Sequence, residues 1–479
     1  MNLSYNIKWV GFTQVGKLIS QLLSMIILAR LIPPAEFGVM AMATVVVNFS
    51  VMFRDLGTSS ALIQKKELGI ETTNAVFGLN MIMGCGLGLI IVALSPFISS
   101  FFNEPKLTYV LILLAFSFPI MSAGAVHLSL LERESRFSLV ALIELSASFS
   151  ALFVSIVAAY KGMGVYSLVL FNLTVAIIST VFLWVKSPWR PTLRKIINLK
   201  EVKGIINYSG NLTLFNIINY LSRNADSIII GRFFNPNILG AYSLAYRIML
   251  FPLQNLTFVV SRSLFPILSK NQDDNSALNE VYTKVVSLVF FIVCPMMLGL
   301  AALREPFIYL IFGEQWRLTA ELLFWLAPTA IIQSIVSTTG TVFMAKGRTN
   351  TLFLLGILAM ILQVGAFIIG ANFNIILFSQ LYFFANLINF FPAMFFTLRL
   401  VGGSMLGLLM GLVNSFVCGI IMFSIVFFAT RNFSKIIPLL SYYGFVFYIS
   451  LGVLVYIVTS YFLCKKEFGI LLGFLKNKK

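Results

Sequence analysis

Charged side chains are scarce in this sequence, and histidine and cysteine are scarcer still. Only 11% of the 479 residues are Asp, Glu, Lys or Arg, whereas about a quarter of the residues in a typical soluble protein are charged. Hydrophobic residues make up 59% of the chain. These proportions exclude an ordinary soluble protein and indicate an integral membrane chain without a separate soluble domain.

Residues that form metal sites, disulfides or catalytic centres are also few. The single histidine, His127, cannot form a metal cluster alone, and the four cysteines lie in or beside apolar segments with no pairing pattern. We find no phosphate-binding glycine loop and no long polar loop that could hold catalytic carboxylates. The sequence therefore predicts no metal site, no cofactor and no enzymatic activity.

Apolar segments long enough to cross a bilayer recur along the whole chain. A spanning helix needs about 20 predominantly apolar residues, and about fourteen such segments can be drawn, the fourth at 108–130 and the seventh at 205–233. We predict an all-α integral membrane fold with about 14 transmembrane helices, arranged as two six-helix lobes plus two C-terminal helices. The predicted parts are the N-terminal lobe (1–185), a basic cytoplasmic linker (186–204), the C-terminal lobe (205–400), and the two extra helices with a basic tail (401–479).

The distribution of lysine and arginine predicts the orientation in the membrane. If the N-terminus is placed inside, most of the cations fall in cytoplasmic loops, as the positive-inside rule requires. This rule accounts for the net charge of +17, so we expect no nucleic-acid partner. An even number of spans places both termini in the cytoplasm, in a bacterial inner (plasma) membrane. The basic linker has one of two roles: it only sets the orientation in the membrane, or it additionally attracts anionic lipid headgroups.

A short motif occurs twice, at an offset of 202 residues. Residues 30–38 (RLIPPAEFG) align with residues 232–240 (RFFNPNILG), so that the arginine, the second proline and the glycine coincide. Each copy is typical of a helix end followed by a proline stop and a tight turn. Two internal symmetric halves are common in transporters.

The same offset aligns polar residues in the first and seventh predicted spans. Steps of three and four residues put each set on one helix face, and a polar face at membrane depth is costly unless it meets protein or water. We therefore predict one polar cavity shared by the two lobes. The aligned sets are Gln14, Lys17, Gln21 and Ser24, and Asn216, Asn219, Arg223 and Asp226.

Ionisable residues inside membrane spans are candidates for function. Cations suit phosphate oxygens, although Arg223 and Asp226 lie three residues apart and can also neutralise each other. Glu144 and Asp226 are candidates for ion coupling, because burial favours the protonated carboxyl; a hydrogen-bonded structural role for Glu144 is the alternative. Arg30 and Arg232 are either outer-mouth cations or snorkelling anchors. The predicted substrate-binding residues are Lys17, Arg54, Arg223 and Arg247.

Two segments carry a family resemblance. Residues 27–38 (ILARLIPPAEFG) and 53–64 (FRDLGTSSALIQ) resemble the polysaccharide transporters of the multidrug/oligosaccharidyl-lipid/polysaccharide exporter superfamily, the Wzx-type O-antigen and capsule flippases. The resemblance implies a flippase that moves undecaprenyl-diphosphate-linked oligosaccharide repeat units from the cytoplasmic to the periplasmic leaflet, by alternating access through a cationic central cavity. It also implies a polymerase and chain-length regulator proteins as partners, and a lipid-tail groove at the last two spans.

Two other functions remain open from the sequence. A multidrug/cation antiporter of the same superfamily needs a membrane-embedded carboxylate for its cation, and Lys17 disfavours this reading. A membrane polysaccharide polymerase usually presents a large loop with catalytic carboxylates, which this chain lacks. The sequence does not identify the sugar repeat unit or the coupling ion.

Overall fold

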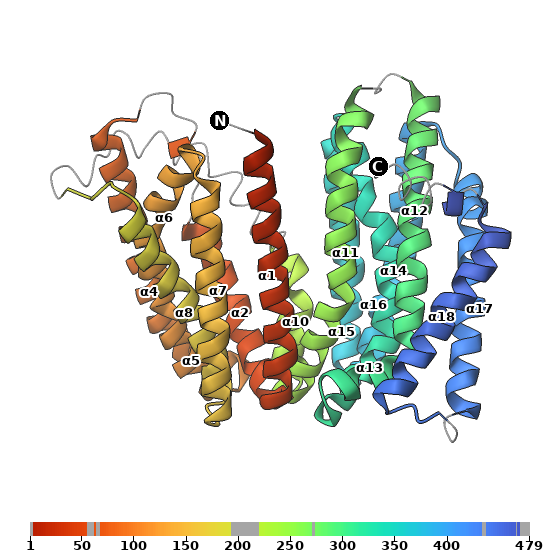
Figure 1. Ribbon diagram of the computed structural model, residues 1–479, viewed down its shortest axis with the longest axis horizontal. Helices are drawn as coiled ribbons and strands as arrows, with labels where there is room; N and C mark the ends of the chain where they lie inside the picture. Colours follow the sequence, from red (N-terminus) through yellow and green to blue (C-terminus); the bar gives the residue numbers. More distant parts are fainter. Residues whose placement is uncertain are drawn as a thin grey trace. The chain divides into compact units, whose positions relative to one another are not determined.

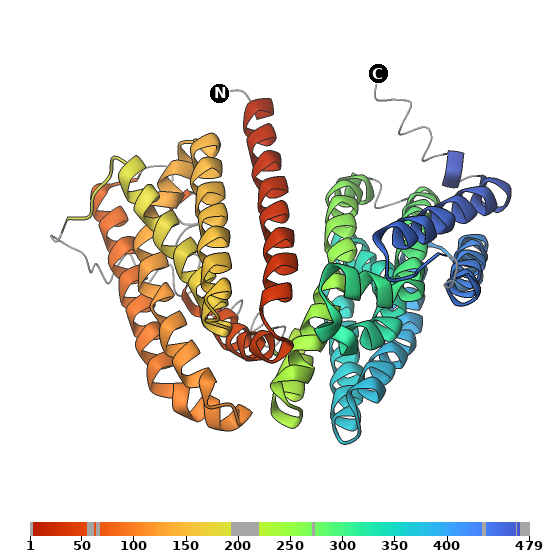
Figure 2. The same ribbon diagram turned by 60° about the horizontal axis from the view of Figure 1, so that its bottom comes forward.

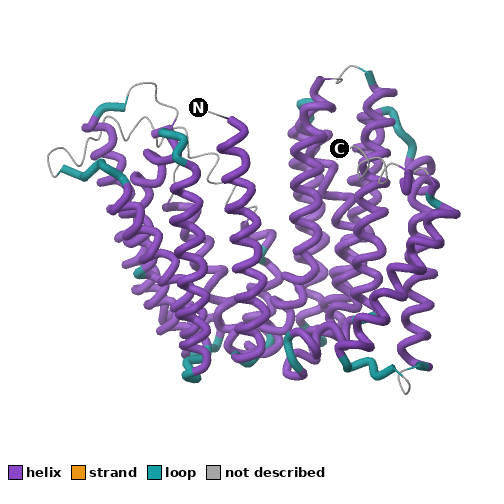
Figure 3. Tube along the Cα trace, viewed as in Figure 1, coloured by secondary structure: helices purple, strands orange, loops and turns teal. Residues whose placement is uncertain are grey.

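The described residues are predominantly helical. The computed structural model describes residues 3–54, 62–63, 68–192, 220–270, 274–433, 437–465 and 467–469, of which the side chains of 3–7, 255–263 and 265–267 are not described. Within these ranges no strand occurs (Figure 3). Twelve helices in these ranges are long and apolar enough to cross a membrane. This confirms the all-α membrane fold, while the number of fourteen spans stays a prediction because residues 205–219 lie outside the described ranges.

The chain divides into two compact units, residues 1–240 and 241–479. The predicted linker, 186–204, is described only as far as residue 192, so the predicted lobe boundaries stay a prediction. The helices of the first unit, coloured red to yellow-green in Figure 1, are α1 (Leu3–Leu31), α2 (Pro34–Arg54), α4 (Ile70–Phe102), α5 (Lys106–Ala115), α6 (Ser117–Arg133), α7 (Phe137–Tyr160), α8 (Val165–Lys186) and α10 (Ala225–Phe233).

The first unit is a bundle in which α7 lies between α1 and α8 (Figure 2), α4 packs on α5 and α6, and α10 packs on α2. Buried side chains of α6, α7 and α8 form one apolar cluster: Leu131, Val140, Ile143 and Leu183. On the outer surface, large apolar side chains such as Leu89 and Phe97 of α4 are more than two-thirds exposed. This is the pattern of helices that pack on one face and meet lipid on another.

The predicted fourth span is broken into two helices. α5 ends at Ala115 and α6 begins at Ser117. Pro119 lacks the N–H that would bond to the carbonyl of Ala115 in a continuous helix, so the chain breaks at this point. The Ala115 carbonyl oxygen lies 3.1 Å from the position of a Cβ on Gly88 of α4, so a larger residue there would require a small shift of one helix.

The Glu36 side chain links the starts of three helices, α2, α5 and α8. Its Oε1 lies 2.7 Å from Nζ of Lys106 at the start of α5, and its Oε2 accepts a 3.0 Å hydrogen bond from the backbone N–H of Val165 at the start of α8. The Glu36 side chain is only 16% exposed. One carboxylate on α2 thus satisfies a cation and an unpaired helix N-terminal donor, which is a favourable place for negative charge.

We expect Glu36→Ala to lower the stability of the protein by about 2–3 kcal/mol, because it removes a charge-assisted bond and leaves a helix N–H unsatisfied. Lys106→Ala is the matched control, since its side chain is 58% exposed and a surface ion pair contributes at most about 1 kcal/mol. Thermal unfolding of the purified protein in detergent measures both. An equal loss in the two variants would show that the ion pair, rather than the backbone bond, is what matters.

The two copies of the repeated motif meet within the first unit. In each copy a helix ends, a proline opens the next helix, and a glycine follows four residues later; α2 begins at Pro34 and α11 at Pro236. A Cβ on Gly38 would collide with the carbonyl oxygen of Pro236, and a Cβ on Gly240 would collide with the carbonyl oxygen of Pro34. Only glycine fits at both crossings. The contact is reciprocal, as at a two-fold axis.

The second unit continues α11 and adds helices to the C-terminus. α17 packs against α12 and α18, while α14 packs on α12 and α16. Pro252, Pro295, Pro328 and Pro392 lie inside helices that continue past them. Its helices are α11 (Pro236–Lys270), α12 (Asn275–Ala302), α13 (Arg304–Ile311), α14 (Arg317–Ala345), α15 (Thr349–Ala371), α16 (Ile375–Val401), α17 (Met405–Asn432) and α18 (Tyr442–Leu463).

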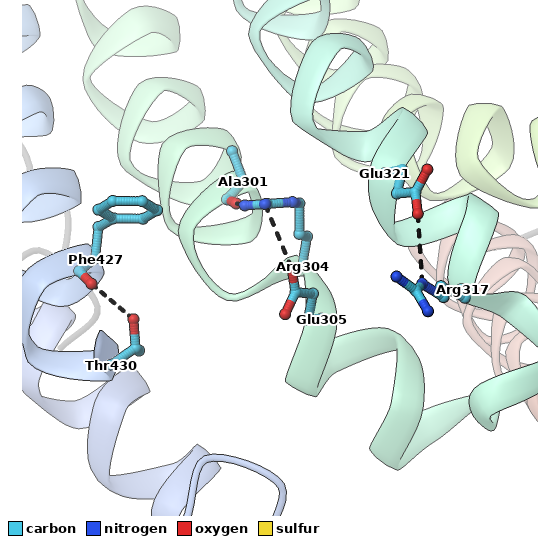
Figure 4. Close-up of polar contacts among 7 residues, drawn as sticks. All are labelled: Ala301, Arg304, Glu305, Arg317, Glu321, Phe427 and Thr430. Atoms are coloured by element: carbon cyan, nitrogen blue, oxygen red, sulfur yellow. Dashed lines mark hydrogen bonds and ion pairs between the residues drawn. The ribbon is translucent and has the colours of Figure 1, made fainter. Parts of the chain in front are cut away.

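Local pairs neutralise two cations where α12 passes into α13 and α14. Figure 4 shows Arg304, which donates to the carbonyl of Ala301 at 3.0 Å and contacts Oε1 of Glu305 at 3.4 Å. Next to it, Arg317 pairs with Glu321 four residues on, at 3.5 Å. Arg317 and Glu321 are at least half exposed, and such surface pairs contribute little to stability.

Candidate functional site

The first unit contains a cavity of about 240 Å³ between its helices. Side chains from α1, α2, α4, α6, α7 and α8 line it, and its charged lining residues are Lys17, Arg54 and Glu144. The remaining wall mixes apolar groups with hydrogen-bonding groups, which suits a ligand that has both polar and apolar parts. The neutral polar lining residues are Asn80, Ser122, Ser148, Ser179 and Thr180.

Lys17 and Glu144 form an ion pair in this cavity. Nζ of Lys17 on α1 lies 2.7 Å from Oε2 of Glu144 on α7, and their side chains are 38% and 31% exposed. The neighbouring residue Gly16 lets α1 approach closely, because a Cβ there would collide with the Leu145 side chain. The pair thus lies where α1 packs on α7, and both groups remain accessible from the cavity.

A second carboxylate, Glu132, belongs to the same electrostatic group. It lies one turn beyond the cavity-lining Leu128 on α6 and interacts electrostatically with both Glu144 and Lys17. Glu132 and Glu144 flank the tight turn between α6 and α7, which ends one helix at Arg133 and begins the next at Phe137. Glu132 thus adds a second negative charge near the Lys17–Glu144 ion pair.

Two further lining residues bear on ligand binding. Nη1 of Arg54, at the end of α2, lies 3.3 Å from the Met121 sulfur, which places the guanidinium at the cavity wall. Oγ of Ser122 is buried and has no hydrogen-bond partner. Because buried polar atoms are nearly always paired in native proteins, an unpaired hydroxyl in a cavity wall indicates a place where a ligand or water supplies the partner.

Arg223 and Asp226, also predicted as site residues, lie elsewhere in the first unit. Neither is among the residues that line this cavity. Arg223 is exposed, whereas Asp226 is buried in the first turn of α10. An Asp226 oxygen accepts a 2.6 Å hydrogen bond from the backbone N–H of Ser227. A carboxylate in a first helical turn stabilises the helix, so this geometry also gives Asp226 a structural role.

The remaining predicted cations lie at helix ends or on the second unit. Arg30 is exposed in the last turn of α1. Arg232 is in the last turn of α10, with its guanidinium carbon 5.5 Å from the centre of the Phe101 ring, a cation–π distance. Arg247 is an exposed residue of α11 in the second unit.

The four polar residues predicted to form one stripe on the first span (Gln14, Lys17, Gln21 and Ser24) do not all face the cavity. Gln14 and Gln21 are exposed, and among the four stripe residues only Lys17 lines the cavity. Asn216 and Asn219, from the matching stripe, lie outside the described residues. Convergence of the two stripes on one cavity between lobes therefore stays a prediction.

His127 is completely buried near this region. Its ring lies 4.7 Å from that of Trp184 and 5.2 Å from that of Trp189, and neither ring nitrogen has a hydrogen-bond partner. In the described ranges, no group of three or more His, Cys, Asp or Glu residues could hold a metal ion. His127 is accordingly a packing residue among aromatic rings.

Sequence reasoning missed Glu132, Asn80 and Ser122. Glu132 lies just past the predicted core of the fourth span, and the other two are neutral residues inside spans. A usable signal was available for Glu132, because it and Glu144 lie within ten residues of the same turn, and helices joined by a short turn are antiparallel neighbours. Nothing in the sequence distinguishes Ser122 from the other serines of its span.

Known proteins resemble this chain over most of its length. A family model described as "Polysaccharide biosynthesis protein" matches residues 27–321. An uncharacterized membrane protein in the cps region of Klebsiella pneumoniae is 30% identical, over 71% of this chain and 70% of that protein. The lipopolysaccharide biosynthesis protein WzxC of Escherichia coli (strain K12) is 27% identical, over 76% and 74%.

Among solved structures, the lipid II flippase MurJ in an inward closed conformation has the same fold. The TM-score is 0.72 at 16% sequence identity, and the match covers 94% of this chain and 98% of that chain. At this level of identity the likeness concerns the fold alone.

Proposed function

Because this chain belongs to the polysaccharide biosynthesis protein family, we propose that it is a flippase for undecaprenyl-diphosphate-linked oligosaccharide repeat units. It is a multi-pass membrane protein with the fold of a lipid-linked-substrate transporter. A diphosphate with sugars cannot cross hydrocarbon unaided, because its polar groups find no hydrogen bonds there. The polyprenyl tail, in contrast, can remain in lipid.

The observation that carries this proposal is the polar, charged cavity in the first unit. Its two cations, Lys17 and Arg54, suit diphosphate oxygens, and the hydroxyl and amide groups of its wall suit sugar hydroxyls. We place the diphosphate at Lys17 and Arg54, with Arg223 and Arg247 as further cations on its path. Glu144 and Asp226 are the coupling candidates, and Arg30 and Arg232 the candidates for the outer mouth.

The orientation follows from the charges around the cavity. The cavity lies toward the end of the first unit where α6 ends and α7 begins, an end rich in cations such as Arg133, Arg136 and Lys186. By the positive-inside rule we assign this end to the cytoplasm, so that the substrate enters the cavity from the inner leaflet. Outward movement of an anion across an inside-negative membrane is favourable by about 2.3 kcal/mol per charge per 100 mV.

We further propose that α17 and α18 hold the polyprenyl tail, because both expose large apolar side chains, such as Met410 on α17 and Val446 on α18. The released product would pass to a polymerase and chain-length regulator proteins on the periplasmic side.

The test is an alanine series at the four proposed substrate cations. Lys17→Ala, Arg54→Ala, Arg223→Ala and Arg247→Ala should each lower polysaccharide export roughly tenfold at unchanged protein level, since a charge-assisted hydrogen bond contributes about 1.5–3 kcal/mol. Lys161→Ala, an exposed cation in the turn between α7 and α8, is the matched control. Lipid-linked repeat units should accumulate on the cytoplasmic leaflet of a deletion strain. Normal export by all four variants would remove this assignment.

A further inference from the structure

The Lys17–Glu144 ion pair poses a problem for any anion that enters the cavity. Lys17 is already bound to a carboxylate at 2.7 Å, so a diphosphate must displace that carboxylate or share the lysine with it. Both partners are about one-third exposed, so exchange of partners requires no unfolding of the helices. When Lys17 binds the diphosphate, the negative charge of Glu144 loses its paired cation.

Among the described residues that line the cavity, Arg54 is the one cation besides Lys17. α7 packs against α1, α6 and α8. Among the described groups, α1 contributes Lys17 and α6 contributes the carboxylate of Glu132, which interacts with Glu144 itself. α8 lines the cavity only with neutral residues, and Arg54 of α2 is the other lining cation, which the same diphosphate would bind.

A displaced Glu144 would therefore lie beside an incoming diphosphate, with the negative charge of Glu132 on the neighbouring helix α6 adding to the repulsion. Like charges close together in a partly buried site disfavour ionisation, so a carboxylate that loses its cation there takes up a proton more readily. On the basis of the proposed function, we propose that binding of a diphosphate to Lys17 is coupled to uptake of one proton by Glu144.

The exchange balances in charge and atoms. Before binding, the Lys17 ammonium is paired with the Glu144 carboxylate. After binding, the same ammonium is paired with a phosphate oxygen, and one proton from water forms a new O–H bond on Glu144. No bond to phosphorus is broken, and no oxidant or reductant is needed.

The direction of this coupling has a consequence for transport. The proton binds together with the substrate, so a lower pH tightens binding, by up to tenfold per pH unit for one linked proton. The loaded site then carries one positive charge outward with the anion, which reduces the charge on which the membrane potential acts. A proton antiporter would show the opposite sign, because there the proton and the substrate compete for the site.

The experiment is calorimetric titration of the full-length protein in detergent with farnesyl diphosphate, at pH 7, in two buffers of different ionisation enthalpy. The difference between the buffers gives the number of protons taken up per ligand. Protonation of the ligand itself is common to all variants and cancels between them. We expect the wild-type protein to take up about one proton more than Glu144→Gln, and Glu71→Gln, an exposed carboxylate at the start of α4, to behave as the wild type.

The outcomes separate this inference from the proposed function. Equal proton uptake in the wild type and Glu144→Gln, with binding intact, overturns the coupling and leaves the flippase proposal standing. If folded, monodisperse wild-type protein does not bind farnesyl diphosphate, both the proton coupling and the flippase proposal are overturned. If Glu144→Gln fails to fold, Glu144→Asp replaces it: the shorter acid should keep the proton uptake, and its failure to do so also contradicts the proposal. Weaker wild-type binding at lower pH contradicts it as well.

Discussion

Lys17→Met is expected to lower transport of lipid-linked oligosaccharide into proteoliposomes at least tenfold. The substitution removes the ammonium that we place on the diphosphate, a loss of about 1.5–3 kcal/mol. It also leaves Glu144, only 31% exposed, without its cation. Lys17→Arg keeps the positive charge, although its planar fork differs from an ammonium, and it should retain most of the activity.

These two effects of Lys17→Met can be separated by a double variant. Lys17→Met/Glu144→Gln removes both charges, so no unpaired carboxylate remains in the cavity. If Lys17 binds the substrate, the double variant stays inactive even though its thermal stability recovers. Recovery of transport would mean that Lys17 serves only to neutralise Glu144, and the substrate assignment would then be lost.

Gly38→Ala is expected to destabilise the protein by more than about 2 kcal/mol, because the new methyl group collides with backbone rather than with a movable side chain. The carbonyl of Pro236 can move away only if the start of α11 shifts. The matched control is Gly86→Ala on α4, where a Cβ meets nothing within 4 Å; this change should be neutral or slightly stabilising, since alanine favours helix. Thermal unfolding in detergent measures both.

Gly240→Ala provides an independent check on the same contact. Its Cβ would meet the Pro34 carbonyl, so it should lower the unfolding temperature about as much as Gly38→Ala. A normal unfolding temperature in both variants would show that the two helix starts do not approach as closely as described.

Much of the fold was predictable from the sequence because membrane helices leave a strong signal. The repeated motif located the ends of α1 and α10 and the starts of α2 and α11, since proline readily opens a helix. The predicted tight turn at the motif glycine was wrong: Gly38 and Gly240 lie inside α2 and α11, where glycine permits the close contact of the two helix starts. The resemblance to polysaccharide transporters was confirmed by the family match. The break between α5 and α6 was harder to foresee, because Pro119 interrupts a helix while Pro295, Pro328 and Pro392 do not.

The site was predictable in its residues more than in its contacts. Lys17 and Glu144 were both selected as ionisable groups at membrane depth, yet their pairing could not be foreseen, because 127 residues separate them and no pattern in one sequence encodes a contact between distant helices. Lys17 and Arg54 do line one cavity. The sequence also predicts that Lys17, Arg223 and Arg247 line one shared cavity, and this stays a prediction.

The reciprocal contact between the two motif copies makes the structure of each copy depend on the other. Each glycine is confined by the other copy's proline carbonyl, so a side chain at either glycine forces the starts of α2 and α11 apart and opens both crossings at once. Neither copy can be remodelled alone. A substitution at either glycine therefore disturbs the first turn of both helices together.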